Sequence, residues 1–306
     1  DVMQNYSVLQ TSMVAAERVF ELMDRQDFEP KQAEEGPEIQ VGNIDFQHVS
    51  FSYDGKREIL KDISFSVKQG ETIAFVGSTG SGKSSIMEFG LRRAQGPDGA
   101  MSATRAAINL FLRFYEFEKG KILIDGRDIR DYSQAELRRN IGLVLQDPFL
   151  YHGTIASNIR MYQENLSRAE VEEAARFVDA HVFISQLAQG YDSPVTERGS
   201  TFSSGQRQLL AFARTIATKP KILILDEATA NIDSETEELI QHSLRKMRQG
   251  RTTIAIAHRL STIQDANCIY VLDKGRIIES GSHEELLAQN GTYKKMYQLQ
   301  AGMMDA

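Results

Sequence analysis

The stretch Gly77-Ser78-Thr79-Gly80-Ser81-Gly82-Lys83-Ser84 decides the fold of this chain, because it fits the pattern G-x-x-x-x-G-K-[ST] of a phosphate-binding loop. Residues 72–76 before it are mostly apolar and predict a short buried strand. A strand, a glycine-rich turn and a helix start direct backbone N–H groups and partial positive charge at one point. The stretch therefore predicts a nucleoside triphosphate site, in which Lys83 reaches the β- and γ-phosphates and the Ser84 hydroxyl ligates Mg²⁺.

Two carboxylates follow an apolar run later in the chain, in Ile222-Leu223-Ile224-Leu225-Asp226-Glu227. A buried strand that ends in Asp places its carboxylate at the C-terminal edge of the sheet, where open α/β folds bind ligands. Asp226 is then expected to hold Mg²⁺ through water, and Glu227 to polarise the attacking water. The alternative, for the pair seen alone, is a solvated acidic turn after a core strand. Together with the glycine-rich loop upstream, it predicts triphosphate hydrolysis.

Composition limits the class of protein. The chain has 306 residues, of which 41% are apolar and 25% charged, so a packed globular core is expected. Acidic residues outnumber basic ones by 42 to 35, which argues against a nucleic-acid partner. The single cysteine, Cys268, excludes an internal disulfide and stands in an apolar run, where it is expected to fill the core. The chain opens on Asp1 and not on Met, which suggests a piece of a longer protein.

The pattern of apolar residues predicts an α/β domain with a parallel sheet, because strand-like and helix-like stretches alternate. Residues 1–28 are expected to be helical and residues 29–40 to form a polar linker. The segments expected to be strands are 44–51, 63–67, 121–126, 141–146, 221–225, 252–257 and 268–272, and the helix-rich segments are 154–189 and 204–217.

A third stretch, Thr201-Phe202-Ser203-Ser204-Gly205-Gln206-Arg207-Gln208, closely resembles the signature LSGGQ of ABC transporter ATPases. The resemblance to that family runs over about residues 41–300, with its motifs in the family's order. Each single match is weak, because a lone Tyr or His near a strand is more often packed in the core. The further matches are Tyr53 for the aromatic residue that stacks on adenine, Gln146 for the Q-loop, Asp233 for the D-loop and His258 for the switch histidine.

The resemblance implies a RecA-like parallel-sheet core, an N-terminal antiparallel β-subdomain and a helical signature subdomain at about 147–217. It also implies ATP and Mg²⁺ as cofactors, with two such domains closing head to tail around two nucleotides. The residues it assigns to catalysis are Glu227, His258, Lys83 and Gln146, and those it assigns to the metal are Ser84, Gln146 and Asp226. The residues it assigns to the nucleotide are Tyr53, Gly77, Ser78, Thr79, Gly80, Ser81, Gly82, Lys83, Ser84, Ser85, Asp226, Ser203, Ser204, Gly205, Gln206 and Asp233.

Two segments are similar to exporters within that family. Val195-Thr196-Glu197-Arg198-Gly199 resembles the VGERG segment, which contacts the membrane domain in exporters. The run at residues 15–24 looks like the stretch that joins the last transmembrane helix to the ATPase domain. We therefore expect residues 1–40 to be helix and linker of a missing transmembrane domain, and residues 41–306 to be the ATPase domain. The resulting hypothesis is a soluble fragment that works at the cytoplasmic face of the cell membrane. It powers export of drug-like or lipid-like cargo.

The signature departs from the family pattern at two positions: Phe202 replaces Leu, and Ser204 stands where LSGGQ has Gly. A Cβ and a hydroxyl at that place are expected to weaken contact with the γ-phosphate. The combination with an intact Glu227 resembles one half of bacterial heterodimeric multidrug exporters, in which a different ATPase chain completes the site. A homodimer that tolerates Ser204 remains open.

About twenty residues, near 88–108, also interrupt the family pattern between the phosphate loop's helix and residue 109. They include Gln95-Gly96-Pro97-Asp98-Gly99, which breaks a helix. Because the insertion follows Lys83 closely, a nucleotide-binding module with little hydrolysis is an alternative function. A soluble ABC ATPase that acts on DNA or ribosomes is another, and an importer ATPase is disfavoured by the exporter-like segment around Thr196.

Overall fold

The computed structural model describes residues 35–52, 55–56, 58–77, 103–145, 148–161, 163, 165–196, 199–226, 234–257 and 259–302. Contacts divide the chain into two units, Asp1–Lys31 and Gln32–Ala306, and every described residue belongs to the second. The helix expected over 1–28 lies outside the described residues. No helix in the described part of the chain is both long enough and apolar enough to cross a membrane.

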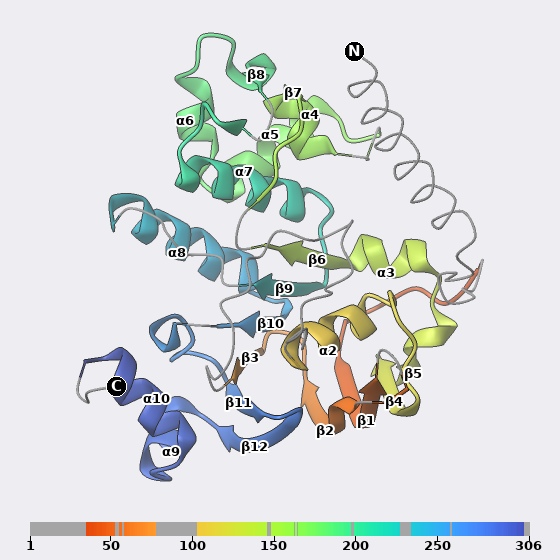
Figure 1. The fold of residues 1–306 in the computed structure, drawn as a ribbon. Helices are drawn as coiled ribbons and strands as arrows, with labels where there is room; N and C mark the ends of the chain where they lie inside the picture. Colours follow the sequence, from red (N-terminus) through yellow and green to blue (C-terminus); the bar gives the residue numbers. More distant parts are fainter. Residues whose placement is uncertain are drawn as a thin grey trace, which may run out of the picture. The chain divides into compact units, whose positions relative to one another are not determined.

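The described elements are shown in Figure 1. The strands are β1 (Ile44–Ser52), β2 (Glu58–Val67), β3 (Thr72–Gly77), β4 (Lys119–Ile124), β5 (Arg127–Asp128), β6 (Ile141–Val144), β7 (Gly153–Thr154), β8 (Pro194–Val195), β9 (Ile222–Asp226), β10 (Thr252–Ile256), β11 (Cys268–Asp273) and β12 (Arg276–Gly281). The α-helices are α2 (Ala103–Phe111), α3 (Gln134–Asn140), α4 (Ile155–Arg160), α5 (Arg168–Phe177), α6 (His181–Ser185), α7 (Ser204–Ala217), α8 (Ser234–Arg248), α9 (His283–Ala288) and α10 (Thr292–Gln300). Three short 3₁₀ turns are η1 (Ile129–Asp131), η2 (Gly190–Asp192) and η4 (Leu260–Thr262).

A six-stranded sheet forms the centre of this unit, in the order β12-β11-β3-β10-β9-β6. All neighbouring pairs are parallel except β11 with β12. The apolar runs at 222–225 and 252–255 are buried in β9 and β10, as expected for strands covered on both faces. The predicted α/β class with a parallel core is therefore confirmed.

A second, antiparallel sheet has the order β2-β1-β4-β5 and confirms the expected N-terminal β-subdomain. Its core is aromatic: Phe46 and Phe65 stack with ring centroids 4.4 Å apart, and Phe65 meets Phe75 of the central sheet at 5.0 Å. Such contacts between large rings add packing energy to the burial of apolar area. They join the antiparallel sheet to one face of the central sheet.

Strand β3 shows how the two faces of the central sheet are covered. Ile73 and Phe75 belong to the apolar cluster that includes the antiparallel sheet and helix α2. Ala74 and Val76 belong to a second cluster, which includes the helices α4, α5, α7 and α8. Because successive side chains of a strand point to opposite faces, this alternation places the helices and the antiparallel sheet on opposite sides of β3.

Helices α4 to α7 make up the helical subdomain, and Figure 1 shows them gathered as one group. The starts of α4, α5 and α7 are fixed by capping boxes at Thr154, Ser167 and Ser203, each of which satisfies otherwise unpaired N–H groups. The helix-rich segments expected at 154–189 and 204–217 are confirmed.

The polar segment before β1 is held mainly by the Asp125 carboxylate. Both oxygens of Asp125, in the turn after β4, accept hydrogen bonds at 2.9 Å from the backbone N–H groups of Gln40, Val41, Gly42 and Asn43. The N–H of the buried Ile39 donates to Glu136 at 2.8 Å. We call this arrangement the Asp125 clamp. It fixes residues 39–43 within the second unit, a few residues after that unit begins at Gln32.

The structure bears on the expected insertion and on Cys268. Of the insertion expected at 88–108, residues 88–102 lie outside the described part, and residues 103–108 form the first two-thirds of helix α2. Cys268 is half-buried at the start of β11 and packs against the edge of the apolar cluster, so it fills the periphery and not the centre of the core.

Candidate functional site

The C-terminal ends of four neighbouring parallel strands meet at one edge of the central sheet. Phe75 of β3 pairs with Ile256 of β10, and Ile256 pairs with Asp226 of β9. On the far side of β9, Leu225 pairs with Val144, the last residue of β6. The ends of β3, β10, β9 and β6 therefore lie level with one another. Open parallel sheets bind their ligands at such an edge.

Two of the site residues expected at this edge are described. Gly77 is the exposed last residue of β3, and the nearest atom to a Cβ built on it is the Leu272 carbonyl oxygen at 3.8 Å. Asp226 is the half-buried last residue of β9. The expected site residues that lie outside the described residues are Tyr53, Ser78, Thr79, Gly80, Ser81, Gly82, Lys83, Ser84, Ser85, Gln146, Glu227, Asp233 and His258.

The signature residues form the start of helix α7. Ser203 is the N-cap: its hydroxyl accepts from the Gln206 N–H at 3.1 Å, and the Gln206 side-chain carbonyl accepts from the Ser203 N–H at 3.1 Å. Both expected nucleotide ligands therefore also fix the helix start. Ser204 is the first helical residue and is half-buried. Phe202, which replaces Leu, is buried and meets the Phe183 ring edge-on at 6.4 Å, so this departure changes core packing.

Gly205 lies against the first turn of helix α8. A Cβ on Gly205 would stand 2.1 Å from Cγ2 of Thr236, so no larger residue fits without a shift of one helix. Because Thr236 follows the D-loop segment by three residues, this contact joins the signature to the segment that contains Asp233. The two glycine positions of the LSGGQ pattern thus differ in this chain: the one at 205 is required by packing, and the one at 204 carries a serine.

Helix α7 is also tied to strand β6. The side chain of Gln208 is buried, and its Nε2 donates to the Leu145 carbonyl at 3.4 Å. The Thr215 hydroxyl donates to the Leu143 carbonyl at 3.3 Å. Leu145 immediately precedes Gln146 in the sequence. The signature helix is therefore connected to the backbone that leads into the Q-loop.

An exposed aromatic pair follows the Q-loop, and the sequence analysis did not identify it. Phe149 and Tyr151 are 47% and 43% exposed, with ring centroids 4.9 Å apart. Arg214 of helix α7 donates to the Phe149 carbonyl at 2.9 Å and lies 5.6 Å from the Tyr151 ring centroid. In the run Phe149-Leu150-Tyr151 only the middle residue is buried, and no signal in the sequence shows this.

The exporter-like segment lies beside this pair. Strand β7 pairs with β8 through Gly153 with Val195 and Thr154 with Pro194. A Cβ on Gly199, whose φ is +64°, would lie 2.6 Å from Cδ1 of the buried Leu150. Residues 149–154 therefore lie beside residues 194–196 and Gly199, although about forty residues separate the two segments in the sequence.

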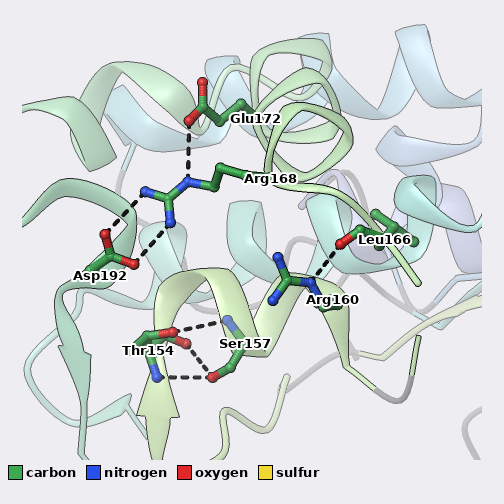
Figure 2. A network of polar contacts seen from close by, with 7 residues as sticks. All are labelled: Thr154, Ser157, Arg160, Leu166, Arg168, Glu172 and Asp192. Carbon is green, nitrogen blue, oxygen red and sulfur yellow. Dashed lines mark hydrogen bonds and ion pairs between the residues drawn. The ribbon is translucent and has the colours of Figure 1, made fainter. Parts of the chain in front are cut away.

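A polar network holds the helical subdomain in shape (Figure 2). The Arg168 guanidinium bridges Asp192 at 2.8 and 3.3 Å and Glu172 at 3.2 Å, and it lies 4.9 Å from the Tyr191 ring centroid. The Arg168 hydrogen bonds hold the pKa of the Asp192 carboxyl below its usual range. Burial raises the pKa of Tyr191 to about 12, so its hydroxyl stays protonated at neutral pH.

Within the described ranges, no group of three His, Cys, Asp or Glu side chains is placed to hold a metal ion. Asp226 is the described member of the predicted Mg²⁺ site. Its predicted companions, Ser84 and Gln146, follow the ends of β3 and β6 in the sequence.

Comparisons with known proteins agree with this geometry. A family model described as ABC transporter matches residues 60–230. The chain is 68% identical over 304 residues to the ABC transporter ATP-binding protein exp8 of Streptococcus pneumoniae serotype 4, covering 99% of this chain and 48% of exp8. It is 48% identical over 301 residues to YheH of Bacillus subtilis, named as a multidrug resistance ABC transporter ATP-binding/permease protein, covering 98% of this chain and 42% of YheH.

A fatty acid ABC transporter ATP-binding/permease protein of Mycobacterium bovis is 41% identical over 291 residues, with 95% of this chain and 43% of that protein covered. Among solved structures, a bacterial Atm1-family ABC exporter with ATP bound matches with a TM-score of 0.76 and 39% identity, over 97% of this chain and 48% of that chain. The chain thus spans about half the length of the relatives it matches.

Proposed function

Because the chain belongs to the ABC transporter family, we propose that it hydrolyses ATP to ADP and phosphate and that this reaction powers export through a membrane domain. The observation that carries the proposal is the common edge formed by the ends of β3, β6, β9 and β10. The phosphate loop, the Q-loop, the Glu227 segment and His258 each follow one of these strands in the sequence. We therefore propose that these residues, far apart along the chain, converge on this edge.

The described residues fit a magnesium nucleotide. Gly77 is exposed at the end of β3, and a Cβ there would make an ordinary van der Waals contact with the Leu272 carbonyl oxygen at 3.8 Å. Asp226 supplies a carboxylate oxygen two strands away, and oxygen ligands are those that Mg²⁺ prefers. When bound, Mg²⁺ supplies charge that neutralises the phosphate oxygens. Ser84, Gln146 and Asp226 are the residues proposed to hold it.

The roles of the remaining side chains follow from their chemistry. Lys83 and the N–H groups of the loop hold the phosphate oxygens, and Glu227 accepts a proton from the attacking water. His258 contacts the γ-phosphate. Tyr53 stacks on the adenine ring. These assignments account for binding, charge neutralisation and activation of water without a covalent intermediate.

We propose that a second ATPase domain completes the site with its own signature segment, and that this chain's Ser203, Ser204, Gly205 and Gln206 serve the partner's nucleotide. Gly205 cannot grow because of Thr236, whereas Ser204 adds a side chain at the start of helix α7. A partner with an unaltered signature would therefore form the more active site with Glu227. This supports a heterodimer, in which the site built on Lys83 and Glu227 is the competent one.

The surface made by residues 149–154 and the neighbouring residues 194–196 and Gly199 supports docking of a membrane domain. Its exposed aromatic pair offers apolar area beside the exporter-like segment, and large aromatic side chains dominate such interfaces. We place this surface at the cytoplasmic face of the cell membrane. The names of two relatives, multidrug resistance and fatty acid, support drug-like or lipid-like cargo.

The test is MgATP hydrolysis by the purified chain over a range of protein concentrations, with Glu227→Gln as the inactive variant. Turnover that rises faster than linearly with concentration, and that is lost in Glu227→Gln, is expected if two copies close around ATP. ATP binding without hydrolysis would contradict an active homodimer and favour the heterodimer. Absence of binding would contradict the nucleotide site itself.

The heterodimer is tested in the assembled transporter, purified through a tag on this chain. Glu227→Gln is expected to abolish most of the hydrolysis of the complex, because only this chain's site pairs an intact glutamate with an unaltered signature. Unchanged hydrolysis would contradict the assignment. Ser204→Gly in the same complex is the matched variant, and it is expected to raise turnover at the other site only.

A further inference from the structure

We propose that Gln300, the last residue of helix α10, is a positioning residue for His258; this inference rests on the proposed ATPase function. The side-chain carbonyl of Gln300 accepts a hydrogen bond from the backbone N–H of Leu260 at 2.9 Å. Leu260 begins the 3₁₀ turn η4 and lies two residues after His258 in the sequence. The C-terminal helix thus reaches the segment that carries the switch histidine.

The contact satisfies a group that the local sequence leaves without an acceptor. The first N–H groups of a helical turn have no partner inside the turn, and the preceding side chain usually supplies one. Here the preceding residue is Arg259, whose side chain has only donors and makes no cap hydrogen bond. Gln300 supplies the acceptor from forty residues further along the chain.

The backbone is held on both sides of His258. On its N-terminal side, the Ala257 N–H donates to the Phe75 carbonyl at 3.1 Å. Phe75 belongs to β3, the strand that leads into the phosphate loop. On its C-terminal side, Leu260 is almost fully buried and donates to Gln300. The described residues on either side of His258 are therefore tied to the phosphate-loop strand and to helix α10.

Helix α10 provides a rigid support for this contact. The Glu279 carboxylate of β12 accepts from the N–H groups of Thr292 and Tyr293, which caps the start of the helix. Tyr293 is completely buried, and its hydroxyl lies 2.7 Å from Nδ1 of His283. Because the start of α10 is fixed on the sheet, Gln300 at its end is held opposite η4.

Loss of the Gln300 acceptor should affect hydrolysis more than nucleotide binding. His258 is assigned to the γ-phosphate, which ADP lacks, while the phosphate loop holds the other phosphates. A misplaced His258 therefore lowers kcat and leaves the affinity for MgADP unchanged. A general loss of structure would change both.

The experiment compares three variants of the assembled transporter with the wild type. Gln300→Ala removes the acceptor, Gln300→Glu keeps one, and Gln298→Ala is the matched control on the same helix. We expect kcat of Gln300→Ala to fall by roughly threefold or more, as loss of one hydrogen bond in the active arrangement implies. MgADP affinity should stay within twofold of the wild type, a range smaller than one such hydrogen bond accounts for. Gln300→Glu and Gln298→Ala should retain kcat.

Amide exchange of Leu260, measured in the full chain, tests the contact without reference to activity. Gln300→Ala is expected to speed this exchange by roughly three- to tenfold, and the other two variants to leave it unchanged. Unchanged exchange in Gln300→Ala overturns the proposal, as does faster exchange with unchanged kcat. If the wild type hydrolyses no ATP, the proposed function fails, and the positioning role of Gln300 is then tested by the NMR signal of the His258 ring in the presence of MgATP. That signal should shift in Gln300→Ala only. An unchanged signal in Gln300→Ala overturns the positioning role.

Discussion

Gly205 and Thr236 pack so closely that a Cβ on Gly205 would lie 2.1 Å from Cγ2 of Thr236. The start of the signature helix α7 is thereby fixed against the first turn of helix α8. Gly205 is consequently a packing requirement inside this chain, independent of any contact that the signature makes with a nucleotide. Stability measurements on the chain alone can isolate this role.

Gly205→Ala is expected to destabilise the chain by about 1–3 kcal/mol, the usual cost of forcing an extra carbon into a packed contact. Thr236→Ser removes Cγ2 and keeps the hydroxyl, so the double variant should recover at least half of the loss. Urea unfolding of the wild type, both single variants and the double variant measures the coupling. An equal loss from Gly205→Ala in the Thr and Ser backgrounds would show that this contact is not the cause.

The Asp125 clamp predicts a large effect from a small change. Asp125→Asn replaces one of two carboxylate acceptors by an NH₂ group and removes the charge, and the backbone can keep its φ of +51°, which Asn tolerates. We expect a loss of about 1.5–3 kcal/mol in the free energy of unfolding, typical of hydrogen bonds to a charged group. Asp131→Asn is the control, because Asp131 is exposed on η1. Equal stability of the two variants would contradict the prediction.

The Asp128–Arg130 pair predicts a dependence of stability on pH. Arg130 donates to Asp128 from Nε at 2.8 Å and from Nη2 at 2.7 Å, which lowers the pKa of the Asp128 carboxyl. A carboxyl with a lowered pKa in the folded state stabilises the fold above its unfolded pKa, near 4, and this contribution is lost as the pH falls through the folded pKa.

Asp128→Asn should therefore cost about 0.5–1 kcal/mol at pH 7, in keeping with a partly exposed pair, and clearly less at pH 3. Urea unfolding at both pH values measures the difference. Asp131→Asn again serves as the control and should show no such change. A cost for Asp128→Asn that is the same at pH 7 and pH 3 would mean that the charge of Asp128 is not responsible.

The exposed aromatic pair predicts a defect in coupling. Phe149→Ala should leave ATP binding by the isolated chain within twofold of the wild type, because the substitution lies on the surface. In the assembled transporter, loss of this aromatic side chain should weaken docking by about 1–2 kcal/mol. Ile278→Ala is the matched control, since Ile278 is 45% exposed and Phe149 is 47% exposed. Co-purification of the chain with its membrane domain measures docking, and equal recovery of both variants would contradict the prediction.

The sequence predicts the central sheet well for a physical reason. Strands buried on both faces need continuous apolar runs. The runs ending at Leu225 and Ile256 are of this kind, and they are shielded from water only when both faces of the sheet are covered. The chemistry at the strand ends stays a prediction from the sequence, which rests on glycines, a lysine and paired carboxylates at the spacings of a phosphate-binding loop and a metal site. The sequence around Gly205 also identifies the signature. It does not reveal that Gly205 packs against Thr236.

Other features depend on tertiary contacts that no local pattern encodes. Phe149 and Tyr151 alternate with the buried Leu150, and a run of three apolar residues does not reveal which of them faces outward. The turn at Asp125 is visible in the sequence, but its four backbone partners lie more than eighty residues earlier. Gln300 is an ordinary helical surface residue until α10 is placed beside Leu260.

The Asp125 clamp binds main-chain atoms only, and this has a consequence for variation among related chains. Gln40 and Val41 contribute N–H groups that almost any residue possesses, so their side chains are free to change without loosening the attachment. The attachment depends on the side chain at position 125, which lies far along the sequence from the segment that it holds. A chimera that carries another transporter's residues 40 and 41 should therefore keep this attachment, provided that the aspartate is retained.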